Sequence, residues 1–207
     1  MNIQSSKIYP MTNQKLQEIK LFAKKKMGKS RDPQHDFDHL ERVAQNALKI
    51  VGLLKLQDKV DTNLLQAICY LHDLTYVRYR SNLITYFFEG YLIRGRLREV
   101  YRTINIDPQE KKIIHQAIVK HPLSFPFKLL NKNGSLYTKI LQDADTLDYF
   151  HELRIKKFRE SHDGGFFDWF WKAIIDLVTK RGTENISVYL NFPEVADYFY
   201  GQNKKKQ

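Results

Sequence analysis

Apolar residues recur three and four positions apart through most of this chain, which is the spacing of one buried face of an α-helix. Val43, Ala47 and Ile50 show the pattern in one segment, and Leu64 and Ile68 repeat it in another. The pattern predicts a protein that is nearly all helix. The helices are expected at residues 12–27, 36–55, 61–73, 84–104, 108–121, 135–158, 166–181 and 191–201.

Capping and turn residues support several of these boundaries. Gly28 stands where the first predicted helix would end, and glycine is common just after a helix. Asp107 followed by Pro108 is typical of an N-cap with proline at the first helical position. Ser135 is a favourable N-cap for a further helix. Two stretches are predicted to be loops, at residues 122–134 and 161–165.

The composition is that of a protein able to bury a substantial core. The chain has 207 residues, 43% of them hydrophobic, and no internal repeat or Pro/Gly/Ser-rich linker divides it. Neither a charged-then-apolar leader nor an 18-residue apolar run is present, so we expect a cytoplasmic protein without a membrane span. The single cysteine, Cys69, cannot form an intramolecular disulfide and is expected to be buried and unreactive.

The net charge of +11 would ordinarily suggest nucleic acid or an anionic surface as a partner. Its distribution argues otherwise. Residues 1–30 hold seven lysines and one glutamate, and Lys204, Lys205 and Lys206 follow near the other end, so these two segments carry nine of the eleven net charges. We therefore expect solvated basic ends, with weak polyanion association at most and no specific nucleic-acid partner.

Three short strings concentrate histidine and aspartate inside segments predicted to be helical. They are HDFDHLERV at 35–43, CYLHDLTY at 69–76 and LQDADTLDYF at 141–150. Adjacent imidazole and carboxylate groups such as His72 and Asp73 are costly to bury without partners, and a divalent cation is a partner for both. The strings therefore favour a metal site.

In their order and their unequal gaps, the three strings resemble the motifs of the HD-domain metal-dependent phosphohydrolases. The likeness is greatest to the small stand-alone members, which carry HDxxHxxRV before the His-Asp pair and ADxLD after it. The resemblance implies an all-α fold, a single HD-domain helical bundle. The whole chain, 1–207, is then expected to be one domain, with a motif-bearing core at about 30–160, C-terminal helices at about 161–202 and a basic tail at 203–207.

The resemblance also implies the ligands and the reaction. His39, His72, Asp73 and Asp145 would bind a divalent metal ion, and a mixed set of imidazole and carboxylate ligands suits Mn, Fe, Co, Ni, Zn or Mg. The substrate would be a small phosphate ester, with a nucleotide as the expected case. A metal-activated water would attack phosphorus, and Asp73 would help to take its proton.

Two more histidine and aspartate positions are assigned on helical spacing. If the second helix already includes His35, this residue shares a face with His39 and acts as a second catalytic group or faces the substrate. Asp148 lies one turn beyond Asp145, so we expect it to hydrogen-bond a ligand histidine. Asp36 and Asp38 are expected to be N-caps, and Asp38 with Glu41 fits a capping box.

Phosphate recognition requires cations or hydrogen-bond donors close to the metal. Arg80, which lies beside the second string, is one cation that could bind phosphate. His115 is expected to be structural. His121 resembles the family position that follows the His-Asp helix, and the resemblance implies that it touches substrate or a second ion, although the role of a capping or surface histidine fits equally well. The residues expected to bind substrate are Arg42, Arg78, Lys120 and His121.

Several local patterns have competing interpretations. HDFDH is similar to the HExxH helix of zinc proteases, but that assignment leaves His72, Asp73 and Asp145 unexplained. A second His-Asp pair, His162-Asp163, lies in a predicted loop before two glycines and is expected to have no part in the site. Four aromatic residues could wall a base-binding pocket, but their helical spacing favours core packing; they are Tyr86, Phe87, Phe88 and Tyr91.

Two other functions are compatible with the strings. A metal-stabilised module could bind or sense a nucleotide without turning it over, and a nucleic-acid-associated protein could use the basic ends. Turnover of phosphate esters separates the enzyme from the sensor. A steep salt dependence of polynucleotide binding would indicate the nucleic-acid-associated protein. No feature of the sequence indicates an oligomeric state.

Overall fold

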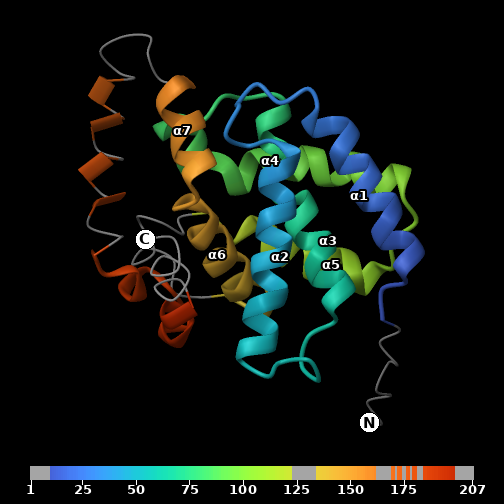
Figure 1. The fold of residues 1–207 in the computed structure, drawn as a ribbon. Coiled ribbons are helices and arrows are strands. Elements are labelled where there is room, and N and C mark those ends of the chain that lie inside the picture. The colour runs from blue at the N-terminus through green and yellow to red at the C-terminus, as the bar shows by residue number, and fades with distance from the viewer. Residues whose placement is uncertain are drawn as a thin grey trace.

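The computed structural model describes residues 10–122, 134–161 and 184–198, together with 169–170, 172–173, 176–177 and 179–180. Every regular element in these residues is a helix, so the all-α prediction is confirmed (Figure 1). None of the helices in this part is long and apolar enough to cross a membrane. The α-helices are α1 (Asn13–Met27), α2 (Phe37–Leu53), α3 (Thr62–Leu71), α4 (Leu83–Thr103), α5 (Pro108–Val119), α6 (Leu136–Tyr149) and α7 (Glu152–Ser161), and the 3-10 helices are η1 (Leu74–Val77), η3 (Ile186–Tyr189) and η4 (Pro193–Val195).

The predicted caps are present. Gly28 is the C-cap of α1, and its N–H donates to the carbonyl of Lys24 at 3.1 Å. Asp107 begins α5 with a complete capping box that includes Glu110, and proline occupies the first turn. Ser135 begins α6 and accepts a hydrogen bond from the N–H of Thr138 at 3.3 Å. Side-chain chemistry therefore sets these helix boundaries locally.

One predicted helix is wrong: residues 135–158 form two helices, with a turn between α6 and α7. The N–H of His151 donates to the carbonyl of Asp148 at 2.8 Å, which is a bond across three residues rather than four. The ring Nδ1 of His151 then accepts a hydrogen bond from the N–H of Leu153 at 3.3 Å. These bonds replace the continuous helical ladder and redirect the chain into α7.

Other predictions fall at least partly outside the described residues. Of the predicted helix at 166–181, the described residues between 169 and 180 are helical. Of the predicted helix at 191–201, the described residues are helical from Pro193 onward. Ser161, placed in a predicted loop, is the last residue of α7. Outside the described residues lie 123–133, the His162-Asp163 pair, the rest of the loop to 165, residues 199–201 and the basic tail at 203–207.

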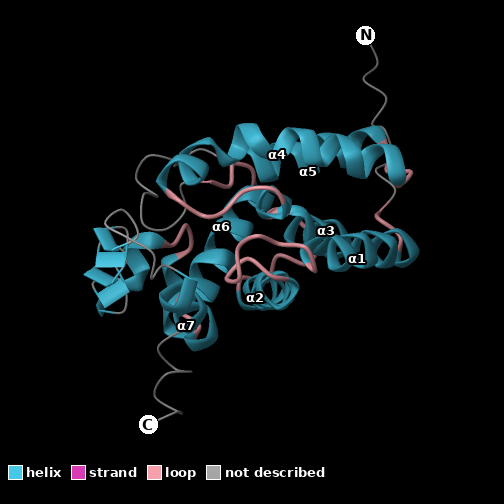
Figure 2. Ribbon diagram, turned by 90° about the horizontal axis from the view of Figure 1, so that it is seen from above, coloured by secondary structure: helices cyan, strands magenta, loops and turns pink. Residues whose placement is uncertain are grey.

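The core of the bundle lies around α2, α3 and α6, which pack closely on one another. Figure 2 shows α3 and α6 between α2 on one side and the α4–α5 pair on the other. The apolar stripe of α2, with Val43, Ala47 and Ile50, is buried as its spacing predicts. Burying a Val or Ile side chain fully stabilises the fold by about 1.5–3 kcal/mol relative to leaving it exposed. This packing holds the three histidine- and aspartate-bearing strings together.

Helix α4 approaches α5 closely at a glycine. A Cβ added at Gly90 would stand 2.5 Å from the carbonyl oxygen of Val119, so a side chain cannot be placed there without moving backbone. The buried face of α4 contains Glu89, Ile93 and Leu97, each four residues apart. The close approach therefore places the carboxyl group of Glu89 in the interior.

The aromatic residues of α4 do not pack into the core as predicted. Phe87, Phe88 and Tyr91 are exposed, and Tyr86 is half-buried. The reason is geometric: the buried stripe of this helix runs through Glu89, and Phe87, Phe88 and Tyr91 fall on other faces, whereas Tyr86 lies one turn before Glu89 on the same stripe.

Candidate metal centre

The start of α2 positions the first histidine of the centre. Asp36 is the N-cap, as predicted, because its carboxylate accepts a hydrogen bond from the N–H of His39 at 2.9 Å. Asp36 also forms an ion pair with Lys157. The predicted capping box of Asp38 and Glu41 is wrong, since Asp38 already lies inside the helix, on its exposed side. His39 is completely buried.

His35 lies in the turn before α2, because the helix begins at Phe37. Its ring stacks on Tyr76, with centroids 3.7 Å apart, and stands edge-on to the ring of His39 at 5.7 Å. Its Nε2 lies 3.9 Å from Oδ2 of Asp73. His35 therefore borders the centre, but it does not form a two-histidine helix face of the kind that a zinc protease uses.

The end of α3 delivers His72 and Asp73, which are both buried. His72 is the C-cap, and its Nδ1 lies 2.7 Å from the carbonyl oxygen of Cys69. A carbonyl can only accept, so Nδ1 carries the proton and Nε2 offers a lone pair. Cys69 is itself buried as expected, and burial raises the pKa of its thiol.

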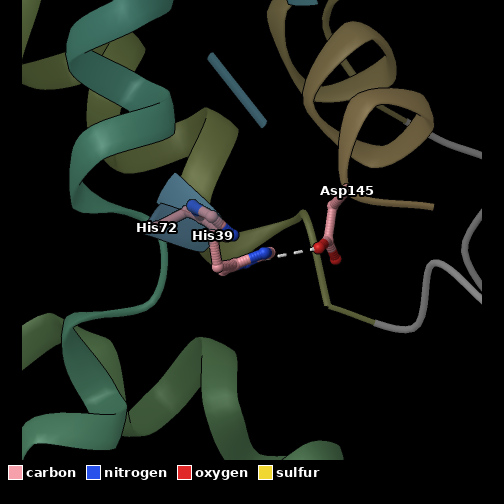
Figure 3. Close-up of side chains that lie close together, drawn as sticks. All are labelled: His39, His72 and Asp145. Carbon is pink, nitrogen blue, oxygen red and sulfur yellow. Dashed lines mark ion pairs between the residues drawn. The ribbon is translucent and has the colours of Figure 1, made fainter. Parts of the chain in front are cut away.

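Helix α6 brings the third string against the first two through Asp145. One ligand atom from each of His39, His72 and Asp145 lies within 4.8 Å of the others, and the same holds for His72, Asp73 and His121. Figure 3 shows the His39 and His72 rings with the Asp145 carboxylate facing them from α6. Residues more than 70 positions apart in sequence therefore share one small volume.

The distances inside this group are short. Oδ2 of Asp73 lies 2.9 Å from Nε2 of His39 and 3.3 Å from Nε2 of His72. Oδ1 of Asp145 lies 3.6 Å from Nε2 of His39. The two Nε2 atoms and Oδ2 of Asp73 are buried and have no hydrogen-bond partner among the described residues. Buried polar atoms without partners are costly, and a divalent cation among them would satisfy all three.

Asp148 hydrogen-bonds the ring of His39 on the side away from the other proposed ligands, as its spacing from Asp145 predicted. Its Oδ2 lies 2.6 Å from Nδ1 of His39, and its Oδ1 accepts a hydrogen bond from Nε of Arg42 at 2.6 Å. The Nδ1 of His39 therefore carries the proton, and Nε2 is left as the ligand atom. This arrangement commits the guanidinium of Arg42 to Asp148.

The electrostatics keep the carboxylates ionised in spite of their burial. Burial raises the pKa of Asp73, but the imidazoles of His72, His35 and His39 lower it well below its ordinary value. Burial likewise raises the pKa of Asp145, and the guanidinium of Arg154 lowers it well below the ordinary value. Both groups are thus available as anionic ligands for a cation.

The structure places the predicted substrate-binding residues at different depths. His121 is buried, its Nε2 lies 3.7 Å from Oδ2 of Asp145, and its ring stands edge-on to that of His72 at 5.0 Å. Arg78 is exposed, with its guanidinium over the ring of Tyr79. Lys120 is exposed at the C-cap of α5. Among these cations and donors, His121 is thus in direct contact with the buried group.

The sequence did not predict two buried ionisable residues at the centre, Arg154 and Glu89. Nη1 of Arg154 lies 2.6 Å from Oδ1 of Asp145, and a guanidinium in this place contributes positive charge to the group. Glu89 is buried, and burial together with Asp73 and Asp145 raises the pKa of its carboxyl group well above the ordinary value. Its spacing of four residues before Ile93 was a usable indication that Glu89 faces inward.

Comparisons with known proteins agree with these motifs. A family model described as an HD domain matches residues 36–149, which is more than half of the chain. This segment contains all four predicted ligands. No curated protein and no solved structure matches the chain.

Proposed function

This chain belongs to the HD-domain family, within a superfamily of metal-dependent phosphohydrolases, and on that premise we propose that it hydrolyses a small phosphate ester. A nucleotide is the substrate class that we expect. The observation that carries the proposal is the presence of three buried ligand atoms without hydrogen-bond partners in the described residues: Nε2 of His39, Nε2 of His72 and Oδ2 of Asp73. Imidazole nitrogen and carboxylate oxygen suit the divalent ions that support phosphate chemistry.

His39, His72, Asp73 and Asp145 are the residues that would hold the ion, which is Mn, Fe, Co, Ni, Zn or Mg. Their donor atoms lie within a few ångströms of one another, and two carboxylates balance the charge of a divalent cation. A bound cation of this kind supplies a positive charge that polarises a phosphoryl oxygen and lowers the pKa of water. His121, grouped with His72 and Asp73, is the residue that we assign to a second ion or to the substrate.

Asp73 is the side chain that we assign to the proton of the attacking water. The water oxygen would bond to phosphorus as the ester P–O bond breaks. One proton of the water would pass to Asp73 and then, through solvent, to the leaving oxygen, so that the products are an alcohol and phosphate. Asp73 is assigned this role because its carboxylate lies among the imidazoles of the centre, with Oδ2 2.9 Å from Nε2 of His39 and 3.3 Å from Nε2 of His72. His35, 3.9 Å from the same carboxylate oxygen, is proposed to face the same water.

The outer part of the substrate would meet more exposed side chains. Arg78 and Lys120 are proposed as contacts for the phosphate or for the group that it esterifies, since both are exposed cations. Arg42 is proposed to act mainly by holding Asp148, because Nε and Nη2 of its guanidinium both bind that carboxylate.

The test is turnover on a panel of nucleotides and simple phosphate esters, with each candidate metal added in turn. We expect the purified chain to retain a divalent metal and to release phosphate, and Asp73→Ala to abolish both. His162→Ala and Asp163→Ala are the matched controls, since the sequence around this second His-Asp pair has two glycines after it and no apolar helical spacing, and we expect them to change neither. If the variants of both His-Asp pairs lost metal retention and phosphate release equally, the assignment of His72 and Asp73 to the metal site would be contradicted. Metal retention without turnover of any ester would indicate a sensing module instead.

A further inference from the structure

Arg154 places a buried cation at the candidate metal centre, and it lies beyond the residues that the family model matches. Its Nη1 donates to Oδ1 of Asp145 at 2.6 Å and stands 3.6 Å from Oδ2 of Asp148. Its Nη2 lies 3.2 Å from Nε2 of His35. Since a guanidinium can only donate, Nε2 of His35 accepts this bond. Arg154 thus touches both sides of the centre.

The turn between α6 and α7 is what makes these contacts possible. In an unbroken helix, a residue nine positions after Asp145 would lie on the opposite face and about 13.5 Å further along the axis. The hydrogen bonds of His151 end α6 and turn the chain, so that Arg154 on α7 points back to Asp145. The fold therefore directs this charge toward the centre.

The guanidinium of Arg154 has more N–H donors than it uses in hydrogen bonds to the described residues. A guanidinium carries five N–H groups. The structure pairs Nη1 with Asp145 and Nη2 with His35, while Nε is buried without a hydrogen-bond partner among the described residues. The neighbouring Arg42 differs, because its Nε and Nη2 are both used on Asp148. Only 6% of the Arg154 side chain is exposed, so water is a poor substitute for a missing acceptor.

We propose that Arg154 binds the phosphoryl group of the substrate, an inference that rests on the proposed function. A phosphoryl oxygen that approaches an ion held by Asp145 comes within reach of a guanidinium already in contact with Asp145. A cation bound to Asp145 also weakens the attraction between this carboxylate and Arg154. N–H groups of the guanidinium then become available to bind the phosphoryl group. Arg154 would therefore make phosphate binding depend on prior binding of the cation.

The competing explanation is that Arg154 only holds Asp145 and His35 in place. The two roles differ in their effect on the cation. A positioning arginine helps the cation to bind, so its removal weakens cation binding. A phosphate-binding arginine repels the cation and attracts phosphate, so its removal leaves cation binding unchanged or tighter while phosphate binding is lost.

The experiment measures two affinities by calorimetry: Mn²⁺ alone, and inorganic phosphate with Mn²⁺ saturating. The variants are Arg154→Met, which keeps the length of the side chain without charge, and Arg154→Lys, which keeps the charge without the planar donors. Arg159→Met is the matched control, because this arginine lies on the same helix and is exposed, paired with Asp176. Circular dichroism and thermal melting check that each variant is folded.

For Arg154→Met, we expect phosphate affinity to fall by roughly tenfold to a hundredfold, which is the loss of charge-assisted hydrogen bonds, with Mn²⁺ affinity unchanged or tighter. Arg154→Lys should lose less phosphate affinity, and Arg159→Met none. Unchanged phosphate affinity, or a parallel loss of Mn²⁺ and phosphate affinity, overturns the inference. If Arg154→Met does not fold, unaltered phosphate affinity in Arg154→Lys overturns it in the same way.

Failure of the proposed function would look different. A wild-type chain that binds no divalent cation, or that hydrolyses no phosphate ester, contradicts the proposed function before any variant is compared. A wild-type chain that binds Mn²⁺ and then phosphate, with Arg154→Met identical to it, contradicts the role of Arg154 alone.

Discussion

At the scale of single residues, the centre depends on which nitrogen each imidazole presents. His39 has its Nδ1 against Asp148, and His72 has its Nδ1 against the carbonyl of Cys69. Both arrangements leave Nε2 as the free lone pair, facing Asp73 and Asp145. The partners of Nδ1, Asp148 and the carbonyl of Cys69, therefore determine which nitrogen each of the two proposed ligand histidines presents to the centre.

Asp148→Asn tests this dependence. The amide cannot hold His39 as the carboxylate does, because its NH₂ group would donate to Nδ1 and favour the wrong tautomer. We expect Mn²⁺ affinity to fall by about tenfold to a hundredfold, measured by calorimetry. Asp58→Asn, at an exposed aspartate, is the control and should leave the affinity unchanged. A folded Asp148→Asn protein with wild-type affinity would show that the tautomer of His39 is set elsewhere.

Asp32 offers a stability test that does not involve the ion. Its carboxylate accepts hydrogen bonds from the N–H groups of Ser81 at 2.7 Å and Gln34 at 3.1 Å. Burial raises its pKa, but His35 and these donors outweigh burial and lower the pKa to about 2. We expect Asp32→Ala to reduce the free energy of unfolding by about 1–3 kcal/mol at neutral pH, measured by urea denaturation.

The pH dependence of that difference has a definite sign. A carboxylate with a depressed folded pKa contributes stability above its unfolded pKa of about 3.9, and loses it as the pH falls toward the folded value. The gap between wild type and Asp32→Ala should therefore be constant above about pH 5 and narrow as the pH falls through 4 toward 2. A gap that widens on acidification would contradict the burial of an ionised Asp32.

At the scale of elements, the site depends on two departures from regular helix packing. The turn at His151 brings α7 back toward Asp145. The glycine at position 90 lets α4 approach α5 and places Glu89 inside. The first departure brings a cation, and the second a carboxyl group, close to the proposed ligands on α2, at the end of α3 and on α6.

Gly90→Ala and Gly95→Ala form a matched pair on α4. The added Cβ at position 90 meets the carbonyl oxygen of Val119, which is backbone and cannot give way cheaply, so we expect destabilisation by about 1–3 kcal/mol. The added Cβ at position 95 meets nothing within 4 Å, so we expect stabilisation by about 1 kcal/mol from helix propensity. Urea denaturation measures both. Equal effects would show that α4 does not depend on close approach at Gly90.

The sequence predicted the helices that rest on local signals. The apolar spacing of Val43, Ala47 and Ile50 and the caps at Asp107 and Ser135 act within a few residues, so their consequences could be predicted from neighbouring positions alone. The turn after α6 could not be predicted in this way. It depends on a ring nitrogen of His151 accepting a backbone hydrogen bond, a geometry for which composition gives no indication.

The same distinction separates the site residues. The strings around His39, His72 and Asp145 could be identified because they repeat a family pattern, and the structure brings them together. Arg154 could not be identified, since one helix over 135–158 would have pointed it away from Asp145. Glu89 was hidden among aromatic residues whose packing was predicted wrongly.

At the scale of the whole molecule, the basic charge and the centre are separate in sequence. Nine of the eleven net charges lie in residues 1–30 and at Lys204, Lys205 and Lys206, whereas the proposed ligands lie between residues 39 and 145. That the chain from 1 to 207 forms one domain stays a prediction, since the family match covers residues 36–149.

Removing residues 202–207 tests this separation. We expect phosphate release to be unchanged, because the segment contributes charge and no apolar periodicity. Weak association with a polyanion such as heparin should decrease, and added salt should decrease it in the full chain as well. A folded truncated protein that has lost phosphate release would show instead that the tail contributes to substrate binding.

The central claim is that four side chains, on α2, on α6 and just after α3, hold one divalent cation. Anomalous diffraction from crystals soaked in Mn²⁺ tests it most directly. We expect one peak bonded at roughly 2.0–2.6 Å to Nε2 of His39, Nε2 of His72 and one carboxylate oxygen each of Asp73 and Asp145. A peak that lacks these ligands, or the absence of any peak among them at saturating Mn²⁺, would contradict the account.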